Sequence, residues 1–203
     1  MEKPNLLYII GRAICAPILK ITHRYRFANR DTIPEEGGYI VACNHLSYSD
    51  PVLLGLGQKR QMNFMAKSTL FKNKFFAALI SRLGAFPVER NAGDGAINHG
   101  IELIENGGVM TIFIEGTRSK TGELLRPRSG AAMIAFQTKA PVIPAAITIE
   151  GGRRNKLFVK RTVRFGEPLT NEELGLINGT PSEYREASRI IMEKIRQMRE
   201  MDI

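Results

Sequence analysis

The sequence lacks several features that mark well-known classes of protein. Its 203 residues include no tryptophan and only two cysteines, Cys15 and Cys43, which show no CxxC or histidine-rich spacing. We therefore expect no metal site and no disulfide framework, and the cysteine content fits a reducing compartment. Aromatic residues make up only 7% of the chain and no nucleic-acid motif is present, so we expect no nucleic-acid partner.

Signatures of cofactor chemistry are also missing. The stretch GLGQKR lacks the third glycine of a dinucleotide fingerprint, and neither a GxxxxGK[ST] loop nor a GxSxG elbow occurs. We therefore expect neither a cofactor nor a covalent intermediate on a serine. Cys43 ends an apolar run, where a cysteine is more typical of packing than of nucleophilic attack.

Positive charge is abundant, with a net charge of +9 and a pI of about 9.8. Such a surface attracts phosphate substrates, acidic carrier proteins or anionic lipid. The N-terminal run NLLYIIGRAICAPILKIT is interrupted by Arg12 and Pro17, which makes it short and charged for a bilayer-spanning helix. We expect residues 1–30 to form an amphipathic segment on a membrane surface, with packing on the protein's own core as the alternative, and residues 31–203 to form one domain.

Strand-like runs alternate with helical patterns along this domain. The alternation predicts an α/β fold with a largely parallel or mixed central sheet flanked by helices. The expected strands are 38–43, 62–66, 85–88, 109–114, 142–149 and 157–165, and the expected helices are 51–57, 73–84, 95–108, 129–140 and a final helix from the TPSE capping box to Met201.

The segment NHLSYSD follows the first of these strands. His45 and Asp50 can touch only if the chain leaves the strand near Cys43, turns and begins a helix near Asp50, because a continuous helix or strand would point them apart. In the alternative, Asp50 merely caps a helix that has Pro51 at its first position. The pairing alone is weak evidence, since chance yields it with a probability of about six per cent.

The residues that follow the other strands strengthen the prediction that His45 and Asp50 belong to a functional site. Lys67 follows the second strand, Arg90 the third, and Glu115 to Arg118 the fourth. Because parallel sheets bind ligands beyond the carboxyl ends of their strands, these groups would share one edge. A histidine–carboxylate pair beside several cations is a catalytic base next to an anion pocket, and the glycine, hydroxyls and charges of EGTRSKTGE suit a phosphate.

These motifs resemble the glycerolipid acyltransferase family, and within it the bacterial 1-acyl-sn-glycerol-3-phosphate acyltransferases. Asn44, His45 and Asp50 match NHxxxxD, and the run from Phe113 to Ser119 matches FPEGTRS with Ile114 in place of proline. Looser matches are Gly84, Phe86 and Arg90 to the second block and the VIPA of 142–145 to the fourth.

The resemblance implies acyl transfer from an acyl carrier protein or coenzyme A thioester to the sn-2 hydroxyl of lysophosphatidic acid, giving phosphatidic acid. It implies His45 as general base oriented by Asp50, at the cytoplasmic face of the cell membrane and peripherally bound. Substrate contacts are expected from Asn44, Lys67, Arg90, Glu115, Gly116, Thr117, Arg118 and Ser119, of which Lys67 rests on its strand-end position alone. The alternatives are a same-fold acyltransferase acting on glycerol-3-phosphate or another lysolipid, and a non-enzymatic basic module that binds membrane or nucleic acid.

Overall fold

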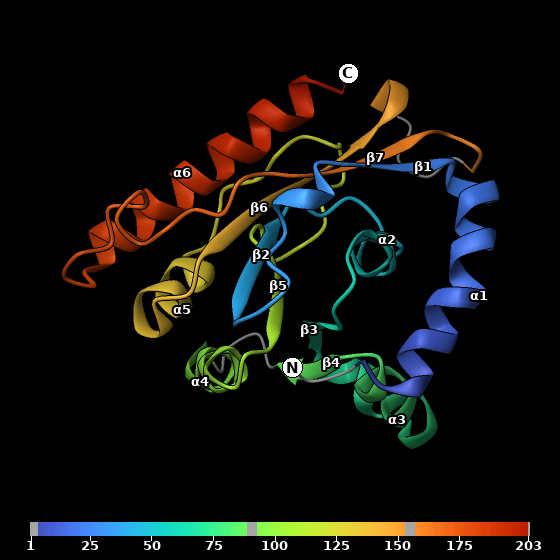
Figure 1. The fold of residues 1–203 in the computed structure, drawn as a ribbon, viewed down its shortest axis with the longest axis horizontal. Coiled ribbons are helices and arrows are strands. Elements are labelled where there is room, and N and C mark those ends of the chain that lie inside the picture. The colour runs from blue at the N-terminus through green and yellow to red at the C-terminus, as the bar shows by residue number, and fades with distance from the viewer. Residues whose placement is uncertain (1–3, 89–92, 153–156, 203) are drawn as a thin grey trace.

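The strand-like runs come together in one sheet, seen in a computed structural model with helices on both faces (Figure 1). The structure describes residues 4–88, 93–152 and 157–202. In chain order the helices and strands are α1 (Leu6–His23), β1 (Tyr25–Ala28), β2 (Tyr39–Cys43), α2 (Asp50–Gly57), β3 (Met62–Lys67), α3 (Lys74–Arg82), β4 (Ala85–Val88), α4 (Gly93–Glu105), β5 (Val109–Phe113), α5 (Gly130–Thr138), β6 (Val142–Ile149), β7 (Arg161–Phe165) and α6 (Pro181–Glu200).

The sheet has seven strands in the order β1-β7-β6-β2-β5-β3-β4. Strands β6, β2, β5, β3 and β4 are mutually parallel, whereas β7 is antiparallel to β6. Cys43 at the end of β2 lies opposite Phe113 at the end of β5. The loops that follow these two central strands therefore leave the sheet side by side, as the strand–helix alternation predicts.

Strand β2 is buried on both faces, and its side chains alternate between two cores. Ile40 and Ala42 pack into the cluster that α4, α5 and α6 cover, while Val41 and Cys43 pack into the cluster that α2 covers. Figure 1 shows the resulting layers, with α4, α5 and α6 on one side of the sheet and α1 and α2 on the other. The predicted capping box at Thr180 and Glu183 begins α6.

Two features at the edge of the sheet differ from the sequence-based expectation. Strand β1 was not predicted, yet it pairs in parallel with β7, so the boundary expected at residue 30 cuts through the sheet. Strand β7 begins at Arg161 rather than at 157, because Phe158 has a positive φ of 63° and its N–H donates to the carbonyl of Thr22 at 2.6 Å.

Helix α1 lies along the outside of α2 and buries only one of its residues, Tyr8. Its 18 residues are long enough and apolar enough to cross a membrane by length and composition alone. However, the Arg12 guanidinium donates to the carbonyls of Lys59 and Leu56 at 3.2 and 3.5 Å, and β1 follows directly. These ties hold the helix along the side of the domain, with one face on the protein and the other exposed.

Candidate active site

His45 and Asp50 meet at the carboxyl edge of the sheet. The chain leaves β2 after Cys43, turns through residues 44–49 and begins α2 at Asp50. The turn brings Nδ1 of His45 to 2.8 Å from Oδ2 of Asp50. Because the carboxylate can only accept, Nδ1 carries the proton and Nε2 of a neutral ring is the unprotonated nitrogen. The predicted contact is therefore present, and the ring presents a basic nitrogen on the side away from Asp50.

The alternative role of Asp50 as a helix cap is wrong, because its carboxylate turns back over the preceding loop. It accepts from the backbone N–H groups of Leu46 and Ser47 at 2.6 and 2.7 Å and from the Ser47 hydroxyl at 2.6 Å. The N-cap position belongs to Ser49, whose side chain makes no capping bond. The carboxylate is fully buried, so its hydrogen bonds fix both the loop and the imidazole.

The loop after β5 holds the loop of residues 44–49 from the other side. One carboxylate oxygen of Glu115 accepts from the backbone N–H of His45 at 2.9 Å, and the other accepts from the N–H of Leu125 at 2.9 Å. The backbone N–H of Ser119 donates to the carbonyl of His45 at 2.9 Å. Burial raises the pKa of Glu115, while the two backbone N–H groups act in the opposite direction. The backbone of His45 is thus fixed at both its N–H and its carbonyl.

Two further contacts of this loop were missed by sequence reasoning. The ring of Phe113 stacks on the imidazole of His45 with centroids 3.8 Å apart. Arg161, at the start of β7, donates from Nη1 to the Ser47 hydroxyl at 3.3 Å. Phe113 lies inside a recognised motif and could have been suspected, whereas Arg161 reaches this edge only because β7 runs antiparallel to β6.

Three of the predicted substrate ligands lie at least partly exposed on the loop after β5. Gly116 and Thr117 are exposed, and the half-buried Arg118 lies over the ring of Tyr48 at 3.5 Å from guanidinium carbon to ring centroid. Gly116 has a φ of +68°, and a Cβ there would lie 2.6 Å from the side chain of Arg128. The position therefore requires glycine on two grounds.

Three other predicted ligands are buried. The Asn44 side chain is fully buried and bonds both the carbonyl and the N–H of Ile147, at 3.0 and 2.8 Å. Ser119 is also fully buried, and Glu115 is only 3% exposed. The polar atoms of these three side chains bind backbone groups of the protein itself. In this structure the three side chains therefore do not point toward a substrate.

The remaining predicted site residues lie farther from the His45 imidazole or outside the residues that the structure describes. Lys67 is exposed at the end of β3, two strands from β2 along the same edge. Arg90 lies outside the described residues. His99 is exposed on α4 with its ring 4.3 Å from that of Phe86. Burial raises the pKa of the Cys43 thiol well above its ordinary value, which disfavours the thiolate a nucleophile needs.

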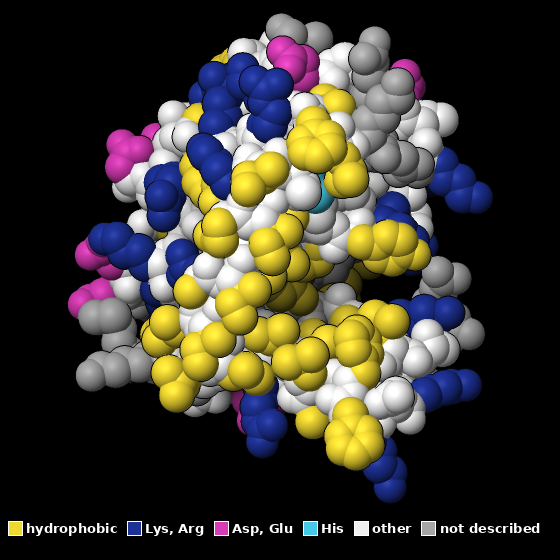
Figure 2. All heavy atoms as spheres, turned by 90° about the vertical axis from the view of Figure 1, so that its right-hand side faces the viewer, with side chains coloured by type: hydrophobic (Ala, Val, Ile, Leu, Met, Phe, Trp, Pro, Cys, Tyr) yellow, Lys and Arg dark blue, Asp and Glu magenta, His cyan; other side chains and the backbone are white. Residues whose placement is uncertain are grey.

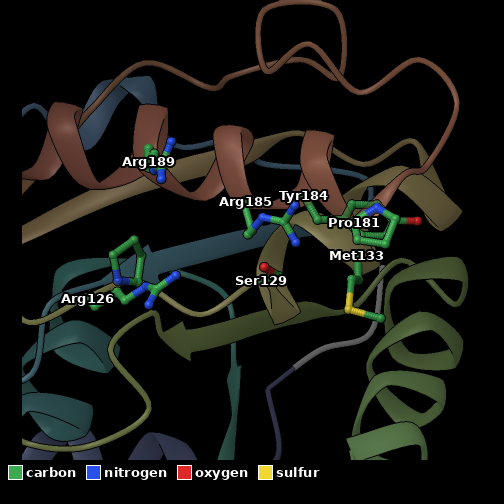
Figure 3. Close-up of a pocket in the computed structure, with 8 residues that line it drawn as sticks. Arg126, Ser129, Met133, Pro181, Tyr184, Arg185 and Arg189 are labelled. Carbon is green, nitrogen blue, oxygen red and sulfur yellow. The ribbon is translucent and has the colours of Figure 1, made fainter.

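Beyond the Glu115 loop, a groove of about 470 Å³ runs between α5 and α6 (Figure 3). Arg126, Arg185 and Arg189 line it together with Ser129. One residue of the chain links the groove to the candidate site, because Arg126 follows Leu125, whose N–H donates to Glu115. Among the residues that the structure describes, no group of three or more His, Cys, Asp or Glu is arranged to hold a metal ion.

Comparison with known proteins found a matching family model, similar sequences and a similar fold. The family model described as "Acyltransferase" matches residues 24–148. A 1-acyl-sn-glycerol-3-phosphate acyltransferase of Bacillus subtilis is 37% identical over 164 residues, covering 76% of this chain and 80% of that protein. An enzyme of the same name from Streptococcus pneumoniae is 28% identical over 186 residues, covering 88% and 68%.

A solved structure shares the fold. The crystal structure of the 1-acyl-sn-glycerophosphate acyltransferase from Thermotoga maritima superimposes with a TM-score of 0.74, at 23% identity, over 96% of this chain and 77% of that one. The likeness extends beyond the matched family region to both ends of the chain.

Proposed function

Because this chain belongs to the acyltransferase family, we propose that it transfers a fatty acyl group from a thioester to the sn-2 hydroxyl of 1-acyl-sn-glycerol-3-phosphate. The product is phosphatidic acid, a precursor in phospholipid synthesis. The observation that carries the proposal is the 2.8 Å bond between His45 and the buried carboxylate of Asp50, with Arg118 on the adjoining loop. In this arrangement the proposed base and the proposed phosphate-binding cation stand on loops that follow neighbouring strands.

In the proposed reaction, Nε2 of His45 takes the proton of the lysolipid hydroxyl as its oxygen attacks the thioester carbonyl. The tetrahedral intermediate then collapses, the carbon–sulfur bond breaks, and the imidazolium returns the proton to the departing thiolate. Asp50 holds the reactive tautomer and stabilises the imidazolium that forms between these steps. General-base help of this kind contributes about 10² to 10⁴ in rate.

The proposed phosphate ligand is Arg118. Its planar guanidinium suits bidentate contact with a phosphate, and the Tyr48 ring holds it in place on the loop next to the base. Thr117 and the backbone at Gly116 are exposed beside it and complete the acceptor side. Glu115 serves as a positioning residue in this scheme, because its carboxylate is occupied by backbone N–H groups.

The donor is proposed to be an acyl carrier protein or coenzyme A thioester whose anionic part lies in the groove between α5 and α6. Arg126 and Arg185 supply positive charge there, whereas Arg189 pairs with Glu186 at 3.1 Å. The thioester then reaches the base from the side of the Glu115 loop while the acceptor phosphate lies at Arg118. In this scheme both substrates approach His45 along the loop after β5, which carries Glu115 and Arg118.

The chain is associated with membranes through its apolar N-terminal helix, and we propose that it lies peripherally on the cytoplasmic face of the cell membrane. The exposed apolar face of α1 and the basic residues Lys20 and Arg24 at its end suit an interface with acidic headgroups. Its ties to α2 through Arg12 support a helix lying in the surface rather than one crossing the bilayer.

A single substitution tests the proposal. His45→Ala is expected to lower transfer to lysophosphatidic acid by about 10² to 10⁴ without changing the unfolding midpoint. His99→Ala is the matched control, since this exposed histidine has no acid partner among the described residues. Near-wild-type turnover by His45→Ala would refute the mechanism, and assays with glycerol-3-phosphate and other lysolipids separate the acceptors.

A further inference from the structure

Helix α3 exposes apolar side chains that nothing in the described structure covers. Within the part of the chain that the structure describes, none of its nine residues is buried. Phe75 is 91% exposed, and Phe76 and Leu79 are close to half exposed. Leu70, in the short 3₁₀ helix that precedes α3, is exposed as well. A helix of this kind requires a partner surface outside the domain.

This apolar face is continuous with that of α1. Asn5, the N-cap of α1, donates to the carbonyl of Arg82 at the end of α3 at 2.5 Å, and Gly11 approaches the side chain of Leu83. Figure 2 shows hydrophobic side chains gathered along the side on which α1 and α3 lie in Figure 1. Of the sixteen large hydrophobic side chains exposed in the described structure, ten belong to α1 or to Leu70 and α3.

Positive charge borders the α3 face. Lys72 and Lys74 lie at the start of the helix and Arg82 at its end, and all three are exposed. Apolar side chains flanked by lysine and arginine match the boundary between acyl chains and acidic headgroups, where the long basic side chains reach the phosphates. An acidic protein partner would bind the three basic side chains but would not account for the three exposed apolar side chains of α3, Phe75, Phe76 and Leu79.

We propose that α3 is a second membrane-contacting element, which enters the lipid interface together with α1. A single interfacial helix leaves the protein free to rotate about the helix axis, and a second contact removes that freedom. The segment from Leu70 to α3 directly follows Lys67, at the edge of the sheet that carries His45. Contact through α3 therefore turns the candidate active site toward the bilayer. The benefit to catalysis rests on the proposed function, since it requires an acceptor that resides in the membrane.

The absence of tryptophan allows a direct test in the full chain. Phe75→Trp would place one fluorophore on the α3 face, and Ile177→Trp, at a position 75% exposed in the loop before α6, is the matched control. On vesicles of phosphatidylcholine with one-third phosphatidylglycerol, we expect a blue shift and quenching by brominated acyl chains at position 75 but not at 177. Vesicle-bound protein with an unshifted signal at position 75 would overturn the proposal.

A loss-of-contact variant separates this inference from the proposed reaction. Phe75→Ser is expected to lower vesicle partitioning about tenfold, whereas Ile177→Ser leaves it unchanged. Transfer to acceptor dispersed in detergent should be equal in wild type and Phe75→Ser, and transfer to acceptor in vesicles should fall. If the wild-type protein transfers no acyl group in either assay, the proposed function is refuted but the proposed membrane contact is not. A blue shift without vesicles that grows with protein concentration would assign the α3 face to a second copy of the chain.

Discussion

Asp50→Asn distinguishes a catalytic carboxylate from one that only shapes the loop. Oδ2 accepts three hydrogen bonds, from Nδ1 of His45 and from the backbone N–H groups of Leu46 and Ser47. Among the described residues, Oδ1 accepts a hydrogen bond from the Ser47 hydroxyl alone, at 2.6 Å. An asparagine with its oxygen at the Oδ2 position retains all three, and its NH₂ group can donate to the Ser47 hydroxyl oxygen. That hydroxyl can then donate to Ser49, 2.8 Å away.

Asp50→Asn therefore keeps a partner for each group that Asp50 binds in the loop and removes the negative charge, which also acts on Arg161. A hydrogen bond to a charged group contributes about 1.5 to 3 kcal/mol, against about 0.5 to 1.5 kcal/mol for a neutral one. The difference of about 1 to 2 kcal/mol applies when the imidazolium forms, so kcat should fall about fivefold to thirtyfold. This loss is smaller than that expected for His45→Ala, because the asparagine oxygen still holds Nδ1–H and the reactive tautomer.

Asp50→Ala provides the contrast. It leaves the buried N–H of Leu46 without an acceptor, which costs about 1 to 3 kcal/mol, and it also frees the imidazole. Steady-state kinetics with lysophosphatidic acid and thermal unfolding of both variants are the measurements. A wild-type kcat in Asp50→Asn would show that the charge has no part in the reaction. Equal loss of stability in Asp50→Asn and Asp50→Ala would show that the loop does not retain its hydrogen bonds as argued.

Three further substitutions test the surrounding site. Arg118→Ala should raise KM for lysophosphatidic acid about tenfold to hundredfold with the KM of the donor unchanged, and an unaltered acceptor KM would move the phosphate site elsewhere. Arg185→Ala should raise the KM of the donor and leave that of the acceptor unchanged. Arg196→Ala, which lies outside the groove on the same helix, should leave both KM values unchanged. If the two variants raise the KM of the donor equally, the groove is not the donor-binding site. Glu115→Gln mimics the protonated acid, and burial raises the pKa of Glu115, so protonation occurs above the usual glutamate range. The ratio of wild-type to variant kcat should therefore shrink as the pH falls through that raised pKa, and a ratio independent of pH would refute the positioning role.

The sequence predicted the strands and helices that form the centre of the sheet, because a parallel strand buried on both faces reads as a continuous apolar run. YIVAC and VIPAAITI are such runs, and both are strands with every residue buried. Strand β1 carried no such signal. Its four residues lie at the edge of the sheet and none is buried, so the pattern YRFA shows neither a full apolar run nor a clear alternation.

At the site, the sequence identified residue types but not the direction in which they point. Asn44, Glu115 and Ser119 lie in the recognised motifs, yet their side chains bind backbone groups of the protein itself. The partner of Asn44 is Ile147, separated by 103 positions, and only the pairing of β2 with β6 brings them together. A motif therefore indicates that a residue is needed at the site, whereas the register of the sheet decides whether it contacts substrate or scaffold.

That register also explains how the proposed base and the proposed phosphate ligand could serve one substrate. Cys43 lies opposite Phe113, so the loops bearing His45 and Arg118 leave neighbouring strands at the same height, about 4.8 Å apart across the sheet. The reacting hydroxyl and the phosphate of the proposed acceptor are separated by only a few bonds, so adjacent loops match its size. The hydrogen bonds of Glu115 and Ser119 to the backbone of His45 then make the two loops one unit. A change in either loop should therefore alter both the rate of proton transfer and the binding of the acceptor phosphate, and the two cannot be tuned independently.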